Sequence, residues 1–222
     1  MSLRTYSAKQ PSFSIILFLL SSFLLFSCSP ATPSVTPQLI PVYSTFAAEP
    51  WLPSLYSCAG ASTVLSRIDD PSAAEILLRV GEPRFLELPA FQIDTEEILI
   101  VTHRQSPIQN LTLEEARALF AGPGDPSVEV WVYATGEDVQ EVFDQVVMAG
   151  RNVTPSARLA VHPQQMADTL VKKSNTVGIL PRHWKAGDTR DVFSVARVPV
   201  LAVTNAEPQG VIQEIIACLQ KQ

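Results

Sequence analysis

The residues best suited to bind a ligand lie where an apolar run meets a helix-like run, in VWVYATGEDVQEVF from Val130 to Phe143. Thr135, Gly136 and Glu137 form the junction. The first turn of a helix carries unpaired backbone amides and a partial positive charge, which attract anions. A threonine hydroxyl adds a donor, and a glycine lets the backbone approach a ligand closely. The junction therefore offers donors that suit a small oxyanion.

Two acidic residues at the same junction, Glu137 and Asp138, oppose that prediction. A carboxylate about 4 Å from an anion repels it by roughly 1 kcal/mol in water and roughly 4 kcal/mol at an effective dielectric of about 20. A helix start stabilises an exposed anion by only about 0.3–1 kcal/mol. Acidic residues also stabilise a first helical turn by themselves, and Thr135 or Gly136 can cap it. The turn either caps its helix only, or caps it and also lines a cleft.

Residues for other chemistries are absent from the sequence. His103, His162 and His183 have no histidine partner one helical turn away and no cysteine or glutamate companion at metal-ligand spacing, so we expect no metal site. The chain lacks a Gly-x-Ser-x-Gly elbow and a phosphate loop ending in Gly-Lys-Ser/Thr. We therefore expect no enzymatic activity, no catalytic residue and no cofactor.

The overall composition is that of a folded, acidic protein. The 222 residues are 46% hydrophobic and 17% charged, which suits one or two globular domains with a real core. The formal net charge is −6. A nucleic-acid partner is not expected, because such binding needs a basic face.

The first residues indicate export. An apolar run from Phe13 to Cys28 follows a positively charged start and is typical of a secretory signal. Its end, LFSC, resembles a bacterial lipobox, which implies a signal peptide over 1–27 and lipidation of Cys28. An uncleaved anchor helix that happens to end in cysteine is the alternative. The Pro/Ser/Thr-rich residues 28–37 read as a flexible tether.

Two cysteines, Cys58 and Cys218, remain once Cys28 is assigned to the lipid. An exported compartment permits a disulfide between them. Two buried free thiols are the alternative, and neither cysteine has a partner at metal-ligand spacing.

Hydrophobic periodicity predicts strands and helices in alternation. Strands are expected at 39–45, 63–68, 75–83, 96–102, 129–134, 158–161 and 176–181, with one or two more in 192–204. Helices are expected at 50–60, 112–121, 137–149 and 163–173, with a last one opening at Pro208. Thr112 and Glu115 form a capping box. Such alternation is typical of a mostly parallel sheet flanked by helices, which binds ligands at the carboxyl ends of its strands.

Four segments in this order, 89–122, 130–143, 163–184 and 206–220, give the chain a resemblance to a known family. The family is that of phosphate-type substrate-binding proteins. Segment 89–122 resembles its crossover strand and Leu-Thr-Leu helix, and 130–143 resembles its second-lobe strand and Ser-Gly-Thr turn. Segment 163–184 resembles its Met-Ala helix and Val-Gly-Ile-Leu-Pro strand, and 206–220 resembles its closing helix. The resemblance implies the α/β, two-lobed periplasmic-binding-protein type II fold. Its lobes would be 38–104 with 193–222, and 105–192.

In that family geometry, three loops face the cleft between the lobes. They contain the residues that we expect to bind ligand: Ser44, Thr45, Gly81, Glu82, Thr135, Gly136 and Glu137. Arg79 is the candidate cation for a dianion, although it could equally be a surface residue. Ser44 and Thr45 could instead cap the first helix. The family's Ser-Gly-Thr turn is here Thr135-Gly136-Glu137, so the ligand chemistry can differ.

The resemblance implies a monomeric lipoprotein at the extracytoplasmic face of a bacterial membrane. It would deliver a small polar solute, phosphate or another oxyanion, to the permease of an ABC importer by closing its lobes over the solute. One alternative is a degenerate binding fold that acts as a sensor or adaptor. The other is an exported hydrolase, for which the sequence offers no catalytic constellation.

Overall fold

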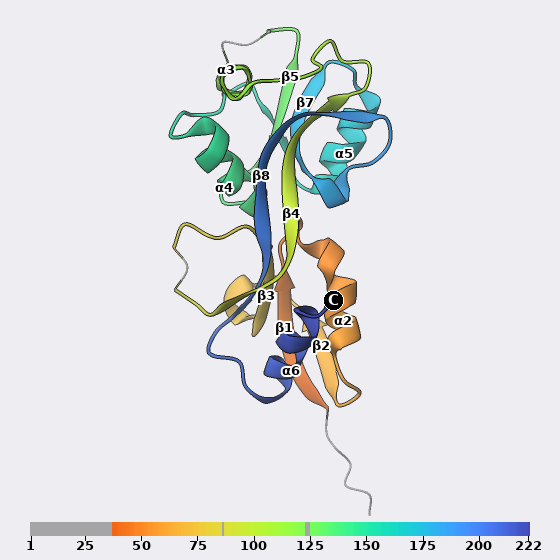
Figure 1. Ribbon diagram of the computed structural model, residues 1–222, viewed down its shortest axis with the longest axis vertical. Coiled ribbons are helices and arrows are strands. Elements are labelled where there is room, and N and C mark those ends of the chain that lie inside the picture. The colour runs from red at the N-terminus through yellow and green to blue at the C-terminus, as the bar shows by residue number, and fades with distance from the viewer. Residues whose placement is uncertain (1–36, 86, 123–124) are drawn as a thin grey trace, which may run out of the picture. The chain divides into compact units, whose positions relative to one another are not determined.

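One mixed sheet organises the described part of the chain, residues 37–85, 87–122 and 125–222 of a computed structural model (Figure 1). Its eight strands lie in the order β2-β1-β3-β8-β4-β7-β5-β6. They are β1 (Gln38–Ser44), β2 (Thr63–Arg67), β3 (Ile76–Val80), β4 (Ala90–His103), β5 (Glu129–Tyr133), β6 (Arg158–Ala160), β7 (Thr176–Pro181) and β8 (Thr189–Thr204).

The expected signal peptide, Cys28 and all but the last residue of the tether lie outside the described residues. Within the described residues, no helix is both long enough and apolar enough to span a bilayer.

The two longest strands, β4 and β8, hold the sheet together. They pair in antiparallel fashion along their whole length, from Ala90 opposite Val203 to His103 opposite Thr189. β3 joins the free edge of β8, and β7 joins the free edge of β4, both in antiparallel fashion. The four other pairings, which involve β1, β2, β5 and β6, are parallel. Two parallel units are therefore attached to opposite sides of one antiparallel pair of strands.

Helices accompany each parallel unit, and together they form two lobes (Figure 1). The first lobe has β1–β3 with α2 (Leu52–Cys58) and α6 (Gly210–Leu219), and the second has β5–β7 with α3 (Leu113–Ala121), α4 (Asp138–Phe143) and α5 (Pro163–Lys172). Short turns are η2 (Glu49–Trp51), η3 (Pro71–Ala73), the π-helical η4 (Asp144–Met148) and η5 (Arg182–Trp184).

The capping box predicted at the start of α3 is present. The Thr112 side chain accepts a hydrogen bond from the Glu115 amide, and the Glu115 carboxylate accepts one from the Thr112 amide at 2.7 Å. Gly122 ends the helix in the left-handed region, with φ of 101°. This helix has an apolar face of Ala116 and Phe120, both fully buried, which packs it onto the second lobe. Local signals therefore define α3 at both ends.

Several element boundaries differ from the sequence prediction. The helix expected over 137–149 is α4 followed by a π-helical turn, and the last helix begins at Gly210 rather than Pro208. Residues 192–204 belong to one strand, β8, which starts earlier, at Thr189. β4 starts at Ala90 instead of 96, because the partly buried Phe91 and Ile93 alternate there with polar residues, a weaker signal than the continuous apolar run that follows.

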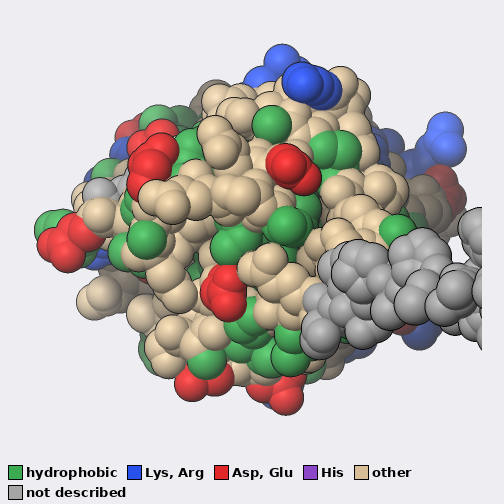
Figure 2. Space-filling view, turned by 90° about the horizontal axis from the view of Figure 1, so that it is seen from below, with side chains coloured by type: hydrophobic (Ala, Val, Ile, Leu, Met, Phe, Trp, Pro, Cys, Tyr) green, Lys and Arg blue, Asp and Glu red, His purple; other side chains and the backbone are tan. Residues whose placement is uncertain are grey.

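The core lies between the sheet and its helices in both lobes. All six residues of β7 are buried, as expected for a strand covered on both faces. Figure 2 views the end of the first lobe and shows acidic side chains spread over it, with basic ones at the edge.

A disulfide joins the two helices of the first lobe. Cys58 in α2 and Cys218 in α6 are bonded, with Cα atoms 5.7 Å apart and 160 residues between them in sequence. The bond closes most of the described chain into one loop. In the chain-entropy description, a loop of this length removes on the order of 5 kcal/mol of unfolded-state entropy, while measured values are typically about 2–4 kcal/mol.

Replacing both cysteines by serine is expected to lower the free energy of unfolding by about 2–4 kcal/mol, because the unfolded chain regains the freedom that the bridge removes. Urea denaturation of oxidised wild type and of the Cys58→Ser/Cys218→Ser variant measures the difference. Reduced wild type is the matched control and should unfold together with the variant. Equal stability of the oxidised wild type and the variant would contradict a structural role for the bridge.

Candidate functional site

A buried carboxylate, Asp138, joins the two lobes at the start of α4. Its Oδ2 atom accepts a hydrogen bond from the Thr45 hydroxyl at 2.6 Å and another from the Val80 amide at 2.9 Å. Both donors belong to the first lobe, whereas Asp138 belongs to the second. Its Oδ1 atom accepts from the amide of Val139 at 2.9 Å, and only 3% of the residue is exposed. The side chain therefore occupies the position predicted for an anion at this helix start.

Burial and hydrogen-bond donors act on the pKa of this carboxylate in opposite directions. Burial raises the pKa of Asp138, and the hydrogen bonds from Thr45, Val80 and Val139 oppose that rise. Burial is also the main reason why the pKa of Glu137 is raised, and repulsion from Asp138 adds to it. The pKa of Asp138 is higher in the folded protein than in the unfolded chain. Its contribution to the free energy of unfolding is therefore fully present below the unfolded-state pKa and is lost as pH rises through the folded-state pKa.

Arg79, the predicted cation, also bridges the lobes. Its Nη2 atom lies 3.0 Å from Glu141 Oε2 on α4, and its Nε atom donates to the Gly81 carbonyl at 3.0 Å. The guanidinium is mostly buried, at 16% side-chain exposure. Attraction to Arg79 also lowers the pKa of Asp138, but less than the hydrogen bonds do. The structure thus directs this cation to a protein carboxylate rather than into open space.

Three other residues predicted to bind ligand, Ser44, Gly81 and Glu82, lie at or just after the ends of β1 and β3. Ser44 is buried and donates to the Thr45 carbonyl at 2.9 Å, which shapes the loop after β1. Gly81 has φ of 77°, and a Cβ there would lie 2.8 Å from Val142 Cγ2, so a glycine lets β3 approach α4. Glu82 is exposed and stands outside this cluster.

The turn between β5 and α4 is open to solvent. Thr135 and Gly136 are exposed, and Gly136 has φ of 96°. The Glu137 amide donates to the Ala134 carbonyl at 3.2 Å and closes the turn. On this side of the cleft the bonds between the lobes come from Asp138 and Glu141 of α4. The helix itself, rather than the turn before it, therefore carries these interlobe bonds.

Very little space remains between the lobes beside Asp138. The cavity there measures about 10 Å³. It is lined by Phe46, Ala47, Tyr133, Glu137, Asp138, Val139, Val161 and Pro163. Such a volume holds at most about one water molecule. In this conformation the space beside Asp138 is too small for a solute.

Aromatic contacts close the cleft on its other flank. The ring of His162 in the second lobe lies 4.9 Å from that of Phe46 in the first, and 4.9 Å from that of Trp184. His162 Nε2 is 3.1 Å from Glu49 Oε2, and the Trp184 indole donates to the Ala47 carbonyl at 3.2 Å. The lobes are thus joined on both flanks of the cleft.

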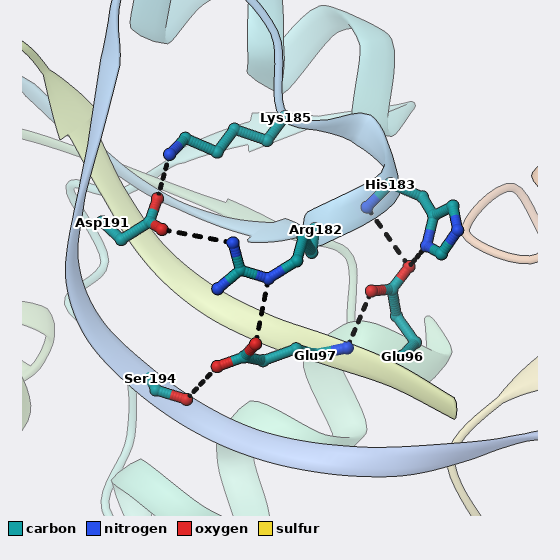
Figure 3. A network of polar contacts seen from close by, with 7 residues as sticks. All are labelled: Glu96, Glu97, Arg182, His183, Lys185, Asp191 and Ser194. Carbon is teal, nitrogen blue, oxygen red and sulfur yellow. Dashed lines mark hydrogen bonds and ion pairs between the residues drawn. The ribbon is translucent and has the colours of Figure 1, made fainter.

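A polar network braces β4 and β8 where they pass between the lobes (Figure 3). The Glu96 carboxylate, on a residue 1% exposed, lies 2.8 Å from His183 Nδ1. Glu97 accepts hydrogen bonds from the Ser194 hydroxyl at 2.7 Å and from Arg182 at 2.9 Å. Both bonds lower the pKa of Glu97, and the bond from Ser194 has the larger effect. The network connects β4 and β8 to the turn after β7.

Sequence reasoning identified the turn before α4 but not the residue that fills the site. The sequence pattern indicates Asp138 only as a competitor for the helix donors, and it gives no signal for Val80 or Glu141. The missing information is spatial, because Thr45 and Asp138 are 93 residues apart, and Arg79 and Glu141 are 62 apart. Among the described residues, no group of three histidine, cysteine or acidic side chains is arranged to hold a metal.

Comparison with known proteins identifies the fold of this chain but assigns the chain to no family. No protein-family model and no curated protein matches the sequence. A putative phosphate ABC transporter substrate-binding protein with bound phosphate from Clostridium perfringens matches with a TM-score of 0.68 at 15% identity, over 82% of this chain and 93% of that one. An ABC-type phosphate transport receptor from Vibrio cholerae gives 0.60 at 13% identity, over 82% and 93%.

Regulatory domains match as well. The regulatory domain of Synechocystis PCC6803 CcmR in complex with 2-PG gives a TM-score of 0.64 at 9% identity, over 83% of this chain and 96% of that one. At these identities the likeness concerns the fold alone. The expected α/β, periplasmic-binding-protein type II fold is confirmed, and both solute-binding proteins and regulatory domains have it.

The hydrogen bond between Thr45 and Asp138 should appear as a coupling energy between the lobes. Thr45→Val alone is expected to destabilise the protein by about 1–3 kcal/mol, since it leaves a buried carboxylate short of a donor. In a double-mutant cycle with Asp138→Asn, urea denaturation should give a coupling of about 0.5–3 kcal/mol. Thr112→Val, far from the cleft, is the control and should be additive with Asp138→Asn. Additivity of Thr45→Val and Asp138→Asn would show that the bond contributes nothing.

Proposed function

We propose that the chain is a non-enzymatic, monomeric binding lipoprotein that holds a small oxyanion between its lobes and passes it to an ABC importer. The observation that supports this most is the convergence of first-lobe donors on one second-lobe carboxylate. Thr45 and Val80 donate to a single oxygen of Asp138. Two donors from one lobe that meet on a single carboxylate oxygen of the other lobe form a site that an oxyanion could occupy, and Asp138 acts as its internal substitute in the closed state.

When the lobes open and close again, a solute would replace the Asp138 carboxylate as the partner of the first-lobe donors. Separation releases Thr45 and Val80 from Asp138, and their donors become available to a ligand that enters the cleft. The contacts of Arg79 with Glu141 and of His162 with Glu49 must break in the same motion. Each of these bonds opposes opening, so the bound ligand must compensate for them, which shifts the population between the two states.

The carboxylate of Asp138 also predicts which oxyanion is preferred. A solute beside an ionised carboxylate is repelled by roughly 4 kcal/mol at about 4 Å and an effective dielectric of about 20. A solute that retains a proton can instead donate a hydrogen bond to the carboxylate, which only accepts. Phosphate retains a proton at neutral pH and sulfate does not, so phosphate is the favoured solute. The phosphate bound to the C. perfringens protein of the same fold supports that choice.

A second function is favoured by a different observation. The donors in the cleft already have partners, and the remaining cavity of about 10 Å³ is too small for a solute. A binding fold held closed by its own side chains would suit a membrane-anchored sensor or adaptor that recognises another protein. The regulatory domain of CcmR shows that the fold is not restricted to binding proteins of importers.

Thermal unfolding with candidate solutes separates the two functions. Phosphate at about 100 times its dissociation constant should stabilise the wild type by about 2.7 kcal/mol. Sulfate should have a much smaller effect, and Thr45→Val should lose the phosphate effect because it removes a ligand donor. Glu82→Gln, which alters an exposed residue of a neighbouring loop, is the control and should retain it.

Three other outcomes count against importer binding. An absence of stabilisation by phosphate, sulfate, molybdate, tungstate and amino acids would favour the sensor or adaptor. Equal stabilisation of wild type and Thr45→Val would place the phosphate outside the cleft. Turnover of an exported ester substrate would favour the hydrolase.

Lipidation of Cys28 is tested separately. Cys28→Ser should release the protein from the membrane fraction, because the thiol that would carry the diacylglyceryl group is absent. Ser34→Ala, a neutral change in the tether, should leave it membrane-bound. Fractionation followed by mass spectrometry of the amino-terminal peptide measures both. Retention of the Cys28→Ser protein with its apolar amino-terminal segment intact would identify an uncleaved anchor helix instead.

A further inference from the structure

A cavity of about 530 Å³ lies within the second lobe, at the carboxyl end of β5. This volume is in the range of small-molecule sites, about 300–1,000 Å³. Its walls are the end of β5, the α4–η4 helix and the segment 151–157. Thr135 lines it, whereas Glu137 lines the small interlobe cavity, so the turn before α4 separates the two spaces.

One wall carries a carboxylate held in place by a buried amide. Gln140 is only 3% exposed. Its carbonyl oxygen accepts from the Tyr133 amide at 3.0 Å, and its Nε2 atom donates to Asp144 Oδ1 at 2.8 Å. Both Gln140 and Asp144 line the cavity. The contacts with β5 therefore fix the carboxylate at the wall of the cavity, with its second oxygen available to a ligand.

The segment 151–157 adds Arg151, an exposed residue, to the lining and is held by a backbone bond. After the π-helical turn, Ala149 and Gly150 both adopt positive φ, at 47° and 88°, and the chain reverses direction. An alanine in this region is uncommon, and π-helical turns often occur at functional sites. Arg151, which follows, lines the cavity, and the Thr154 amide donates to the Phe120 carbonyl at 2.8 Å. This segment is therefore attached to α3.

The cavity thus presents two opposite charges with no protein counter-ion. Neither Asp144 nor Arg151 takes part in any ion pair found among the described residues. The rest of the lining combines hydroxyls and an amide with an aliphatic surface that includes Val132, Val153 and Leu159. A ligand that satisfies this lining carries one cation, one anion and an aliphatic group.

We propose that this cavity binds an aliphatic α-amino acid as its zwitterion. Arg151 receives the carboxylate and Asp144 receives the ammonium group through charge-assisted hydrogen bonds. The side chain lies on the aliphatic surface of Val132, Val153 and Leu159. The site is distinct from the interlobe cleft and does not depend on the function proposed for it, because no residue that donates to Asp138 lines this cavity.

Isothermal titration of the full chain with leucine, leucinamide and N-acetylleucine tests both charges. Leucinamide lacks the carboxylate and N-acetylleucine lacks the ammonium group. Leucine should bind the wild type at least about tenfold more tightly than either derivative, a difference of about 1.4 kcal/mol. Arg151→Gln should weaken leucine and remove its advantage over leucinamide. Asp144→Asn, whose amide oxygen still accepts from Gln140, should remove its advantage over N-acetylleucine.

Arg84→Gln, at an exposed arginine of another loop, is the matched control and should bind leucine as the wild type does. Absence of leucine binding to the folded wild type at about 10 mM would overturn the proposal. Equal affinities of wild type, Arg151→Gln and Asp144→Asn would overturn it as well. If either variant fails to fold, NMR of the wild type decides: shifts at Asn152 and Thr154 support this cavity, and shifts confined to Thr45 and Val80 reject it.

Discussion

The arrangement of the lobes depends on one buried carboxylate. An ionised side chain removed from water is costly unless several donors compensate, and Asp138 has three, two of them from the opposite lobe. Separating the lobes would strip the carboxylate of the Thr45 and Val80 bonds, but it would also return the charge to water. Because these two effects oppose each other, this contact can hold the lobes together without making closure irreversible. A carboxylate is therefore suited to a joint that has to open.

The sheet determines where that joint lies. β4 and β8 cross between the lobes as one antiparallel pair, and β3 and β7 dock on their outer edges. This arrangement brings the end of β3, with Val80 and Gly81, opposite the start of α4. Gly81 lacks the Cβ that would collide with Val142, so the two elements approach closely enough for a direct backbone bond to Asp138. The Glu96 and Glu97 network then braces the same strands on the side of the second lobe (Figure 3).

Local sequence signals predicted most of the elements, and the site only in part. The capping box of Thr112 and Glu115 and the apolar run of β7 act within a few residues, so they can be read directly. The pairing of Asp138 with Thr45 cannot, because an acidic residue in a first helical turn looks the same whether solvent or another lobe faces it. Glu137 and Asp138 are adjacent and chemically alike, and only the direction of each side chain from the helix start separates the exposed turn from the buried joint.

The composition of the turn from Thr135 to Glu137 suggests a binding loop, whereas in the structure the turn separates two spaces. It stands between two spaces that share the strand β5 and the helix α4 as walls. On the interlobe side, the charge at the helix start is already balanced by protein donors, and almost no volume remains. On the other side, Asp144 and Arg151 face a cavity of about 530 Å³ with their charges uncompensated. Because unbalanced charge beside open volume is what a ligand can exploit, the side facing away from the cleft is the one prepared for binding while the lobes are closed.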